Sequence, residues 1–159
     1  KILKIQLIAV GKMSDAPLVQ AVEKYVKRLV HYVPFQLLTV PDVKTTRSMT
    51  GQRQKEAEGS VILSSVDARD LVILLDERGK EFTSREFASY IDRRTLSLPG
   101  NLVFVIGGPY GFSQQVYDRA NDKISLSRMT LTHEMVRLFF VEQLYRAMTI
   151  LRGEPYHHD

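Results

Sequence analysis

The sequence contains no cysteine among its 159 residues, and none of its apolar runs approaches the length of a membrane span. Without cysteine the chain cannot build a disulfide framework, a thiolate metal site or a cysteine nucleophile. A helix that crosses a bilayer needs roughly 18 consecutive apolar residues, so no membrane-spanning helix is expected. Residues 1–7 have the pattern of a strand rather than of a secretion signal, and a cytoplasmic protein is therefore expected.

The excess of one charge sign is also small. There are 22 Lys and Arg residues against 18 Asp and Glu residues, which gives a net charge of +4 and a pI of about 9.4. This mild basic excess is compatible with a nucleic-acid partner but does not require one. Hydrophobic residues make up 44% of the chain, as in ordinary globular proteins. The length predicts one domain, residues 1–159, with a substantial core.

Five apolar segments alternate with five segments of helical spacing. The predicted strands cover 5–10, 35–40, 71–75, 102–106 and 124–127. The predicted helices follow capping residues at Asp15, Thr83, Ser113 and Thr132, with one more helix over 52–64, and residues 42–51 form a polar loop. Regular alternation of this kind predicts an α/β fold with a mostly parallel sheet and helices on both faces.

The segment 102–111 is the most informative stretch of the chain. An apolar run, Leu102–Ile106, stops at the turn Gly107-Gly108-Pro109-Tyr110-Gly111. A continuous apolar run is typical of a strand buried on both faces of a parallel sheet. Glycines allow the main chain to approach another group closely or to adopt positive φ. Because ligands of open α/β sheets bind beyond the carboxyl ends of the strands, this turn predicts a ligand site.

Familiar phosphate-binding loops are absent. Gly11-Lys12 is followed by Met13, and Gly79-Lys80 by Glu81, so neither matches a Walker loop. A dinucleotide site needs a Gly-x-Gly turn after the first strand, and only one glycine stands there. Asp42, at the end of the second strand, has the position of a ribose-binding carboxylate, but without those glycines a turn role is favoured.

Polar residues near the end of the chain allow two interpretations each. The hydroxyls of Ser125, Ser127, Thr130 and Thr132 can bind a ligand or their own main chain, and the second is favoured. His133 is either a general base or a structural hydrogen-bonding residue. The four arginines of this region can contact phosphates, but a solvated or ion-paired face is favoured for each of Arg128, Arg137, Arg146 and Arg152. The tail, 153–159, can reach into a site or be disordered, and its adjacent histidines alone make a weak metal site.

The last predicted helix, 133–151, is apolar around most of its circumference, with a polar stripe of Glu142, Arg146 and Thr149. A helix on the surface of a monomer needs only a single apolar stripe. Cover by a second subunit is the simplest explanation, and a central helix within one domain is the alternative.

Several segments together resemble one known family. The segments 103–111, 125–133 and 142–147, the opening 7–12 and the close 155–158 are similar to the family of ribosomal RNA large subunit methyltransferase H. The resemblance covers nearly the whole chain, in order and at the family's length. It implies a SPOUT methyltransferase with a C-terminal trefoil knot, although chains as a rule do not knot. It also implies a homodimer that binds S-adenosyl-L-methionine (AdoMet) near the subunit interface.

The resemblance further implies methylation of N3 of a pseudouridine in large-subunit rRNA, within the assembled ribosome and without a metal. The implied donor-binding residues are Leu75, Gly107, Leu126, Ser127, Arg128, Met129, Thr130 and Leu131. The candidates for proton removal are His133, Tyr156, His157 and His158. A basic residue often stands where His158 is, so a role that needs a permanent charge there is in doubt. The alternatives are a binding protein of the same fold without catalysis, holding an adenosine-type ligand, and a flavodoxin-like nucleotide binder.

Overall fold

The computed structural model describes residues 4–43, 50–96 and 98–159. Within them, five parallel strands form one sheet in the order β2-β1-β4-β3-β5. The strands are β1 (Ile5–Val10), β2 (Phe35–Val40), β3 (Leu71–Glu81), β4 (Leu102–Ile106) and β5 (Asp122–Ser125). The predicted polar loop over 42–51 falls mostly on residues 44–49, which lie outside the described residues.

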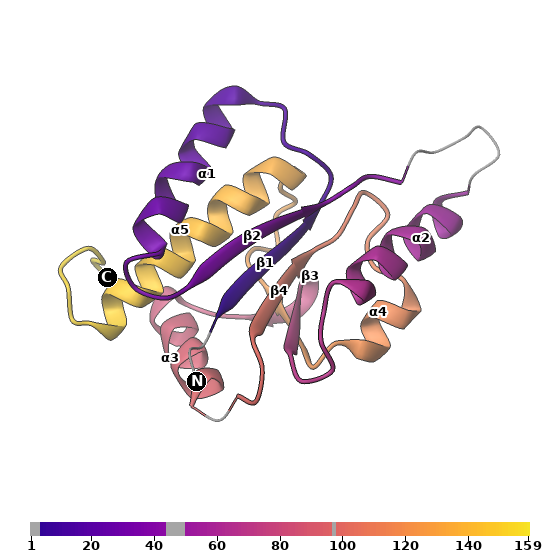
Figure 1. Cartoon of the computed structure of the whole chain (residues 1–159). Helices are drawn as coiled ribbons and strands as arrows, with labels where there is room; N and C mark the ends of the chain where they lie inside the picture. Colours follow the sequence, from indigo (N-terminus) through magenta and orange to yellow (C-terminus); the bar gives the residue numbers. More distant parts are fainter. Residues whose placement is uncertain (1–3, 44–49, 97) are drawn as a thin grey trace.

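Helices cover both faces of the sheet, as predicted (Figure 1). On one face α1, α3 and α5 pack against side chains such as Leu7 and Phe104. On the other face α2 and α4 pack against Ile8 and Val105. The helices are α1 (Ala16–Leu29), α2 (Gly51–Ser64), α3 (Ser84–Thr95), α4 (Gln114–Arg119) and α5 (His133–Leu151).

The predicted capping residues begin these helices. Asp15, Thr83, Ser113 and Thr132 each accept a hydrogen bond from a main-chain N–H three residues on, and Thr50 does the same for α2. Thr83 and Glu86 form the predicted capping box. The local sequence therefore sets where each chain segment turns into a helix.

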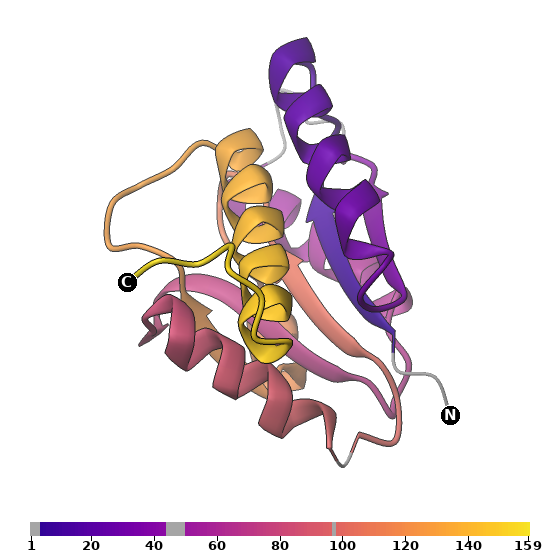
Figure 2. The ribbon, with the colours of Figure 1, turned by 90° about the vertical axis from the view of Figure 1, so that its left-hand side faces the viewer.

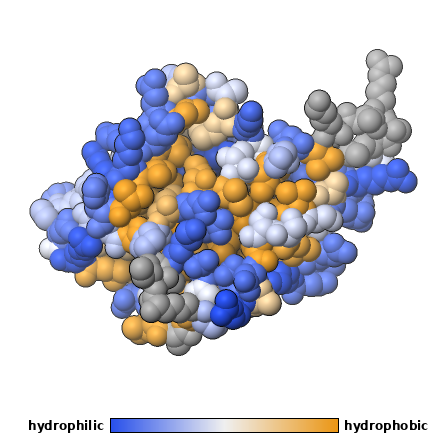
Figure 3. Space-filling model, viewed as in Figure 1, coloured by the Kyte–Doolittle hydropathy of each residue, from blue (hydrophilic) through white to orange (hydrophobic). Residues whose placement is uncertain are grey.

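All five residues of β4 are buried, which confirms the two-sided burial predicted for the run Leu102–Ile106. Figure 3 shows apolar residues spread across the middle of the molecule around a hydrophilic patch, with further hydrophilic residues toward its left and right sides. The central position of β4, between β1 and β3, places the glycine turn that follows it at the middle of the carboxyl edge of the sheet.

The third strand is longer than predicted, and the fifth is displaced. β3 continues past Leu75 to Glu81 because β5 pairs with it in two stretches separated by a bulge. Gly79 makes this possible, since a Cβ atom there would lie 2.6 Å from the main-chain nitrogen of Ile124. β5 accordingly runs over Asp122–Ser125 instead of the predicted 124–127. The apolar run of the sequence marked only the part of β3 that lies inside the core.

The apolar helix α5 lies between α1 and α3 on one face of the sheet (Figure 2). Phe140, Val141 and Leu144 are fully buried there by residues of the same chain. Thr149, expected in a polar stripe, is also fully buried, and its hydroxyl donates to the carbonyl of Arg146 at 2.6 Å. The central-helix alternative therefore accounts for much of the apolar surface. None of the helices in the described ranges is both long enough and apolar enough to cross a membrane.

Candidate functional site

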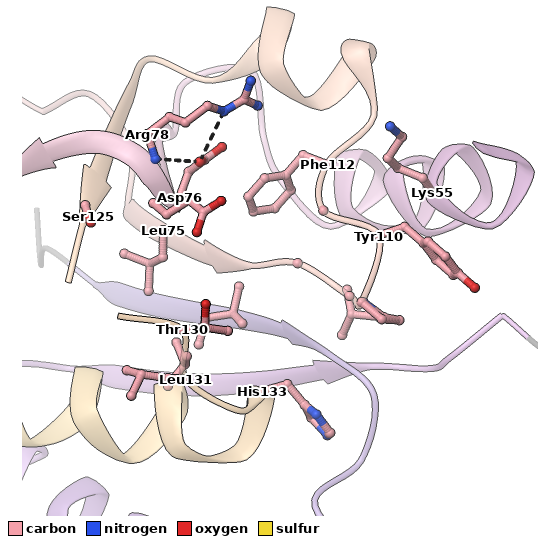
Figure 4. Close-up of a pocket in the computed structure, with 18 of the residues that line it drawn as sticks. Lys55, Leu75, Asp76, Arg78, Tyr110, Phe112, Ser125, Thr130, Leu131 and His133 are labelled. Atoms are coloured by element: carbon pink, nitrogen blue, oxygen red, sulfur yellow. Dashed lines mark hydrogen bonds and ion pairs between the residues drawn. The ribbon is translucent and has the colours of Figure 1, made fainter. Parts of the chain in front are cut away.

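A hollow of about 1090 Å³ opens beyond the carboxyl ends of β3 and β4, where the glycine turn predicts a site (Figure 4). Segments distant in sequence form its wall. Most of the wall comes from the second half of β3, the turn 107–112, the loop 125–131 with the start of α5, and the first turns of α2, and it is completed by Val10, Asp42 and the α4 residues Gln114 and Tyr117. The parallel sheet brings them together, because its strands end on the same edge.

Most of the residues implied for the donor lie in this wall. Leu75, Gly107, Leu126, Ser127, Met129, Thr130 and Leu131 all line the hollow. Arg128 does not, because its side chain is 84% exposed and lies 3.6 Å from the carboxylate of Glu81. Seven of the eight positions are thus gathered around one space by β3, β4 and the loop before α5.

The three glycines of the turn meet different requirements. Gly111 has a φ of 80°, a conformation that favours glycine. A Cβ atom on Gly107 would lie 3.0 Å from the ring of Phe112. A Cβ atom on Gly108 would overlap the carboxylate of Glu58, which is 2% exposed and has one oxygen without a hydrogen-bond partner among the described residues. Bare main chain is therefore needed at Gly107 and Gly108 for packing.

The hydroxyls of the loop 125–132 mostly bind their own main chain, as the sequence favoured. Ser125 donates to the carbonyl of Ser127 at 3.1 Å, and the hydroxyl oxygen of Ser127 accepts from Met129 N–H at 2.9 Å. Thr132 caps α5. Thr130 differs, because its hydroxyl makes no hydrogen bond with a described residue, and it faces the hollow in Figure 4. It is free to bind a ligand.

A cluster that the sequence did not reveal stands in the wall beside Leu75. The hydroxyl of Tyr117 donates a short hydrogen bond to Asp76, whose other oxygen accepts from Arg78 N–H at 2.9 Å. The guanidinium of Arg78 donates in turn to Tyr117. Burial alone raises the pKa of Asp76, but the bonds from Tyr117 and Arg78 outweigh it, and the net pKa is lowered. No motif links these positions, since pairing of β3 with its neighbours and packing of α4 bring them together.

Arg137 was grouped with the candidate phosphate contacts, and the structure buries it completely. Its guanidinium donates to the carbonyl oxygens of Val10 at 2.9 Å and Gly11 at 2.6 Å. Burial lowers the pKa of Arg137, against the opposing fields of Glu134 and Asp42. Arg137 therefore fastens the start of α5 to the end of β1 and cannot reach a phosphate.

Of the four candidates for proton removal, only His133 lines the hollow. His133 is exposed, and its imidazole makes no hydrogen bond with a described residue. The alternative that His133 is a structural hydrogen-bonding residue therefore has no support here. The next residue, Glu134, accepts from the main-chain N–H groups of Ser14 and Asp15 at 2.9 and 3.1 Å. Together with Arg137, Glu134 holds the first turn of α5 in place.

Tyr156 and His157 lie outside the hollow, against the second half of α5. The chain turns back after α5, as Figure 2 shows. Tyr156 donates to Glu142 at 2.7 Å, and His157 lies 3.2 Å from Arg146. Burial, and then the bond to Glu142, raise the pKa of Tyr156. His158 is exposed. Within the described ranges, no group of three or more His, Asp or Glu side chains could hold a metal ion.

Comparison with known proteins agrees with this geometry. A family model described as "Predicted SPOUT methyltransferase" matches residues 3–157. The chain belongs to the SPOUT methyltransferase family. This membership confirms the resemblance and decides against a flavodoxin-like nucleotide binder.

Relatives of this SPOUT methyltransferase match it from end to end. A protein of Parabacteroides distasonis is 50% identical over 157 residues, which is 99% of this chain and 100% of that protein. One of Cytophaga hutchinsonii is 53% identical over 156 residues (98% and 100%), and one of Christiangramia forsetii 52% over 154 residues (97% and 98%). All three are named ribosomal RNA large subunit methyltransferase H.

Proposed function

We propose that residues 1–159 act as one cytoplasmic methyltransferase domain that uses AdoMet to methylate N3 of a pseudouridine in large-subunit rRNA, on the assembled ribosome. The hollow between the glycine turn and the loop 125–131 carries the proposal, because it gathers seven implied donor-binding positions in a SPOUT methyltransferase. The shared name of relatives that match nearly the whole chain supports rRNA as the substrate.

The lining of the hollow fits AdoMet. Leu75, Leu126 and Leu131 offer apolar walls for a ring system, and the bare main chain at Gly107 allows close approach. The free hydroxyl of Thr130 and the ionised carboxylate of Asp76 offer polar partners to a ligand that carries hydroxyl and cationic groups. Because the side chain of Arg128 pairs with Glu81, Arg128 would contact AdoMet through its main chain.

AdoMet supplies, when bound, a methyl group that is already electrophilic, so the protein has two tasks. The first is to hold the acceptor nitrogen in line, and orientation alone can supply up to about 7–11 kcal/mol of the barrier. The second is to accept the proton of N3, where a positioned base adds roughly 10²–10⁴-fold. His133 stands at the hollow for this role. Tyr156, His157 and His158 can take it only from a second copy of the chain, because none of them lines the hollow of its own copy, where Tyr156 and His157 pack on the second half of α5.

We therefore also propose a homodimer, with a trefoil knot in the C-terminal part of each chain. Apolar side chains remain exposed where the loop enters α5, with Met129 81% and Met135 38% exposed. Their neighbours Leu138 and Phe139 are half-buried. Covering such side chains is favourable by about 1.5–3 kcal/mol for each one fully buried. A second copy placed here would lie beside the hollow, because Met129 belongs to its wall.

Transfer of tritiated methyl groups from AdoMet to purified ribosomes tests this function. We expect label in large-subunit rRNA, at a pseudouridine identified by mass spectrometry of nuclease fragments. Because cationic contacts to phosphate dominate such binding, ribosome affinity should fall by roughly 0.7–0.9 log units per contact for each decade of salt. Binding of AdoMet without transfer to ribosomes or free rRNA would favour the alternative, a binding protein of the same fold.

A further inference from the structure

The hollow is larger than one small ligand needs. Its volume of about 1090 Å³ exceeds the roughly 300–1,000 Å³ of typical small-molecule pockets. Tyr110 and Lys55 line one end, and Figure 4 shows them on the side away from Leu75 and Ser125. Neither residue belongs to the donor-binding set proposed above. The hollow therefore has room at this end for part of a second molecule.

Tyr110 presents an exposed ring at the tip of the glycine turn. The residue is 54% exposed, and its hydroxyl makes no hydrogen bond with a described residue. A Cβ atom on Gly51 would lie 2.8 Å from the Tyr110 ring, so the ring lies against the first turn of α2. An aromatic side chain that rests on a helix end and is half exposed provides a flat surface for another ring.

Lys55 adds a positive charge at the same end of the hollow as that ring. Gly51 and Lys55 are four residues apart on α2, and side chains at this spacing lie on the same face of a helix. The ammonium of Lys55 makes no ion pair with a described residue. The first turn of α2 contains no acidic residue, and the helix dipole adds positive potential there.

The acidic residues of the wall do not cancel this charge. Asp76 is held by Arg78 and Tyr117 on the opposite side of the hollow in Figure 4, and Glu77, which also lines the hollow, follows Asp76 directly on β3. Asp42 lies against Gly11, where its carboxylate would be 2.8 Å from a Cβ atom on that residue. The end of the hollow at Tyr110 and Lys55 is thus aromatic and cationic.

An exposed aromatic ring and a free ammonium that line the same end of a hollow are the combination that proteins use for unpaired nucleotides, with stacking on the base and charge pairing with the phosphate. We propose that Tyr110 and Lys55 form a subsite for a nucleotide next to the methylated one in the RNA chain. The acceptor base itself must lie at the end of the hollow where the methyl donor binds. A neighbouring nucleotide therefore occupies the other end, at Tyr110 and Lys55. This inference rests on the proposed rRNA methylation.

Steady-state methyl transfer to ribosomes, with AdoMet affinity measured separately by calorimetry, tests the subsite. We expect Tyr110→Ala to raise KM for ribosomes by about 5- to 100-fold, as loss of one stacked base implies. Tyr110→Phe keeps the ring and should stay within about twofold of the wild type. AdoMet affinity should be unchanged in both variants, which also shows that they are folded.

Lys55→Gln should weaken co-sedimentation with ribosomes and lower the slope of log affinity against log salt by about 0.7–0.9. Lys27→Gln, on the exposed side of α1, removes the same charge elsewhere and should leave KM unchanged.

If wild-type protein methylates ribosomes while Tyr110→Ala and Lys55→Gln match it in KM, the subsite is disproved and the function stands. If Tyr110→Ala also loses AdoMet affinity, the ring supports the turn and the subsite is again disproved. Absence of transfer by the wild type refutes the function instead.

Discussion

The guanidinium of Arg137 donates a hydrogen bond of 2.6 Å to the carbonyl oxygen of Gly11, a residue 126 positions earlier in the chain. The same nitrogen also donates to the carbonyl oxygen of Val10 at 2.9 Å. One side chain of α5 therefore binds two main-chain carbonyls at the end of β1. Val10 and His133 both line the hollow. This contact therefore sets how the first turn of α5 meets the edge of the sheet.

Replacing Arg137 by methionine should lower the free energy of unfolding by about 2–4 kcal/mol, because two charge-assisted hydrogen bonds to buried carbonyls are lost. Urea unfolding followed by circular dichroism measures the change. Arg93→Met, on the exposed side of α3, is the matched control and should shift the midpoint little. Equal midpoints for Arg137→Met and the control would show that the buried guanidinium does not stabilise the fold.

The contact between Gly108 and Glu58 makes a prediction about donor binding. Gly108→Ala brings a methyl group onto the buried Glu58 carboxylate, so the carboxylate or the turn must shift, and we expect AdoMet affinity to fall at least tenfold. Glu58→Ala vacates that space, and the double variant should recover most of the affinity. Calorimetry of the two single variants and the double variant gives the coupling between the positions. Strictly additive losses would mean that the two residues do not compete for the same space.

The lowered pKa of Asp76 predicts a pH dependence of stability. A carboxyl group whose pKa is lower in the folded state than in the unfolded state stabilises the fold above its unfolded pKa. That contribution is lost as the pH falls through the folded pKa. Asp76→Asn should therefore be less stable than the wild type by about 1–3 kcal/mol at neutral pH, with a difference that narrows below about pH 4.

Urea midpoints between pH 7 and pH 2 measure the Asp76 contribution. Tyr117→Phe is the companion variant, because it removes the largest of the contributions that together outweigh burial and lower the pKa of Asp76. The pKa of Asp76, followed by NMR titration, should then rise. A stability difference that is constant down to pH 2 would contradict this assignment.

Deleting residues 154–159 separates donor binding from proton removal. We expect AdoMet affinity to stay within about twofold, because Tyr156 and His157 pack on α5 outside the hollow. If the tail of a second copy supplies the base, methyl transfer falls at least tenfold in the deletion variant, and if His133 supplies it, the loss appears in His133→Ala instead. His133→Ala is the comparison that keeps the tail and removes the imidazole at the hollow. Unchanged transfer by the deletion variant would exclude the tail from catalysis.

Local patterns were enough to predict the bounds of β1, β2 and β4, four of the five helix caps and the position of the glycine turn. The run Leu102–Ile106 is buried on both faces because a parallel strand at the centre of a sheet has no exposed side. Thr83 and Glu86 form a capping box because both partners lie within one turn. Such features depend on neighbours in sequence, and so the sequence reports them.

Contacts between distant segments could not be predicted in this way. β3 runs on to Glu81 because β5 pairs with it there, and Gly79 in an apparent turn is the residue that permits the pairing. The alternation of elements does not say which face each helix covers. α5 therefore could be given its place between α1 and α3 only once the structure was known.

The sequence by itself determined the α/β alternation, the glycine turn after β4 and, through its family resemblance, the loop that forms the opposite wall. Tertiary structure alone decided that Arg137 is a buried clamp, that Asp76 is held by Tyr117 and Arg78, and that Tyr156 lies away from the hollow in its own chain. The physical reason is that burial and hydrogen bonding of a charged side chain depend on its surroundings in space. Those surroundings come from segments far apart along the chain.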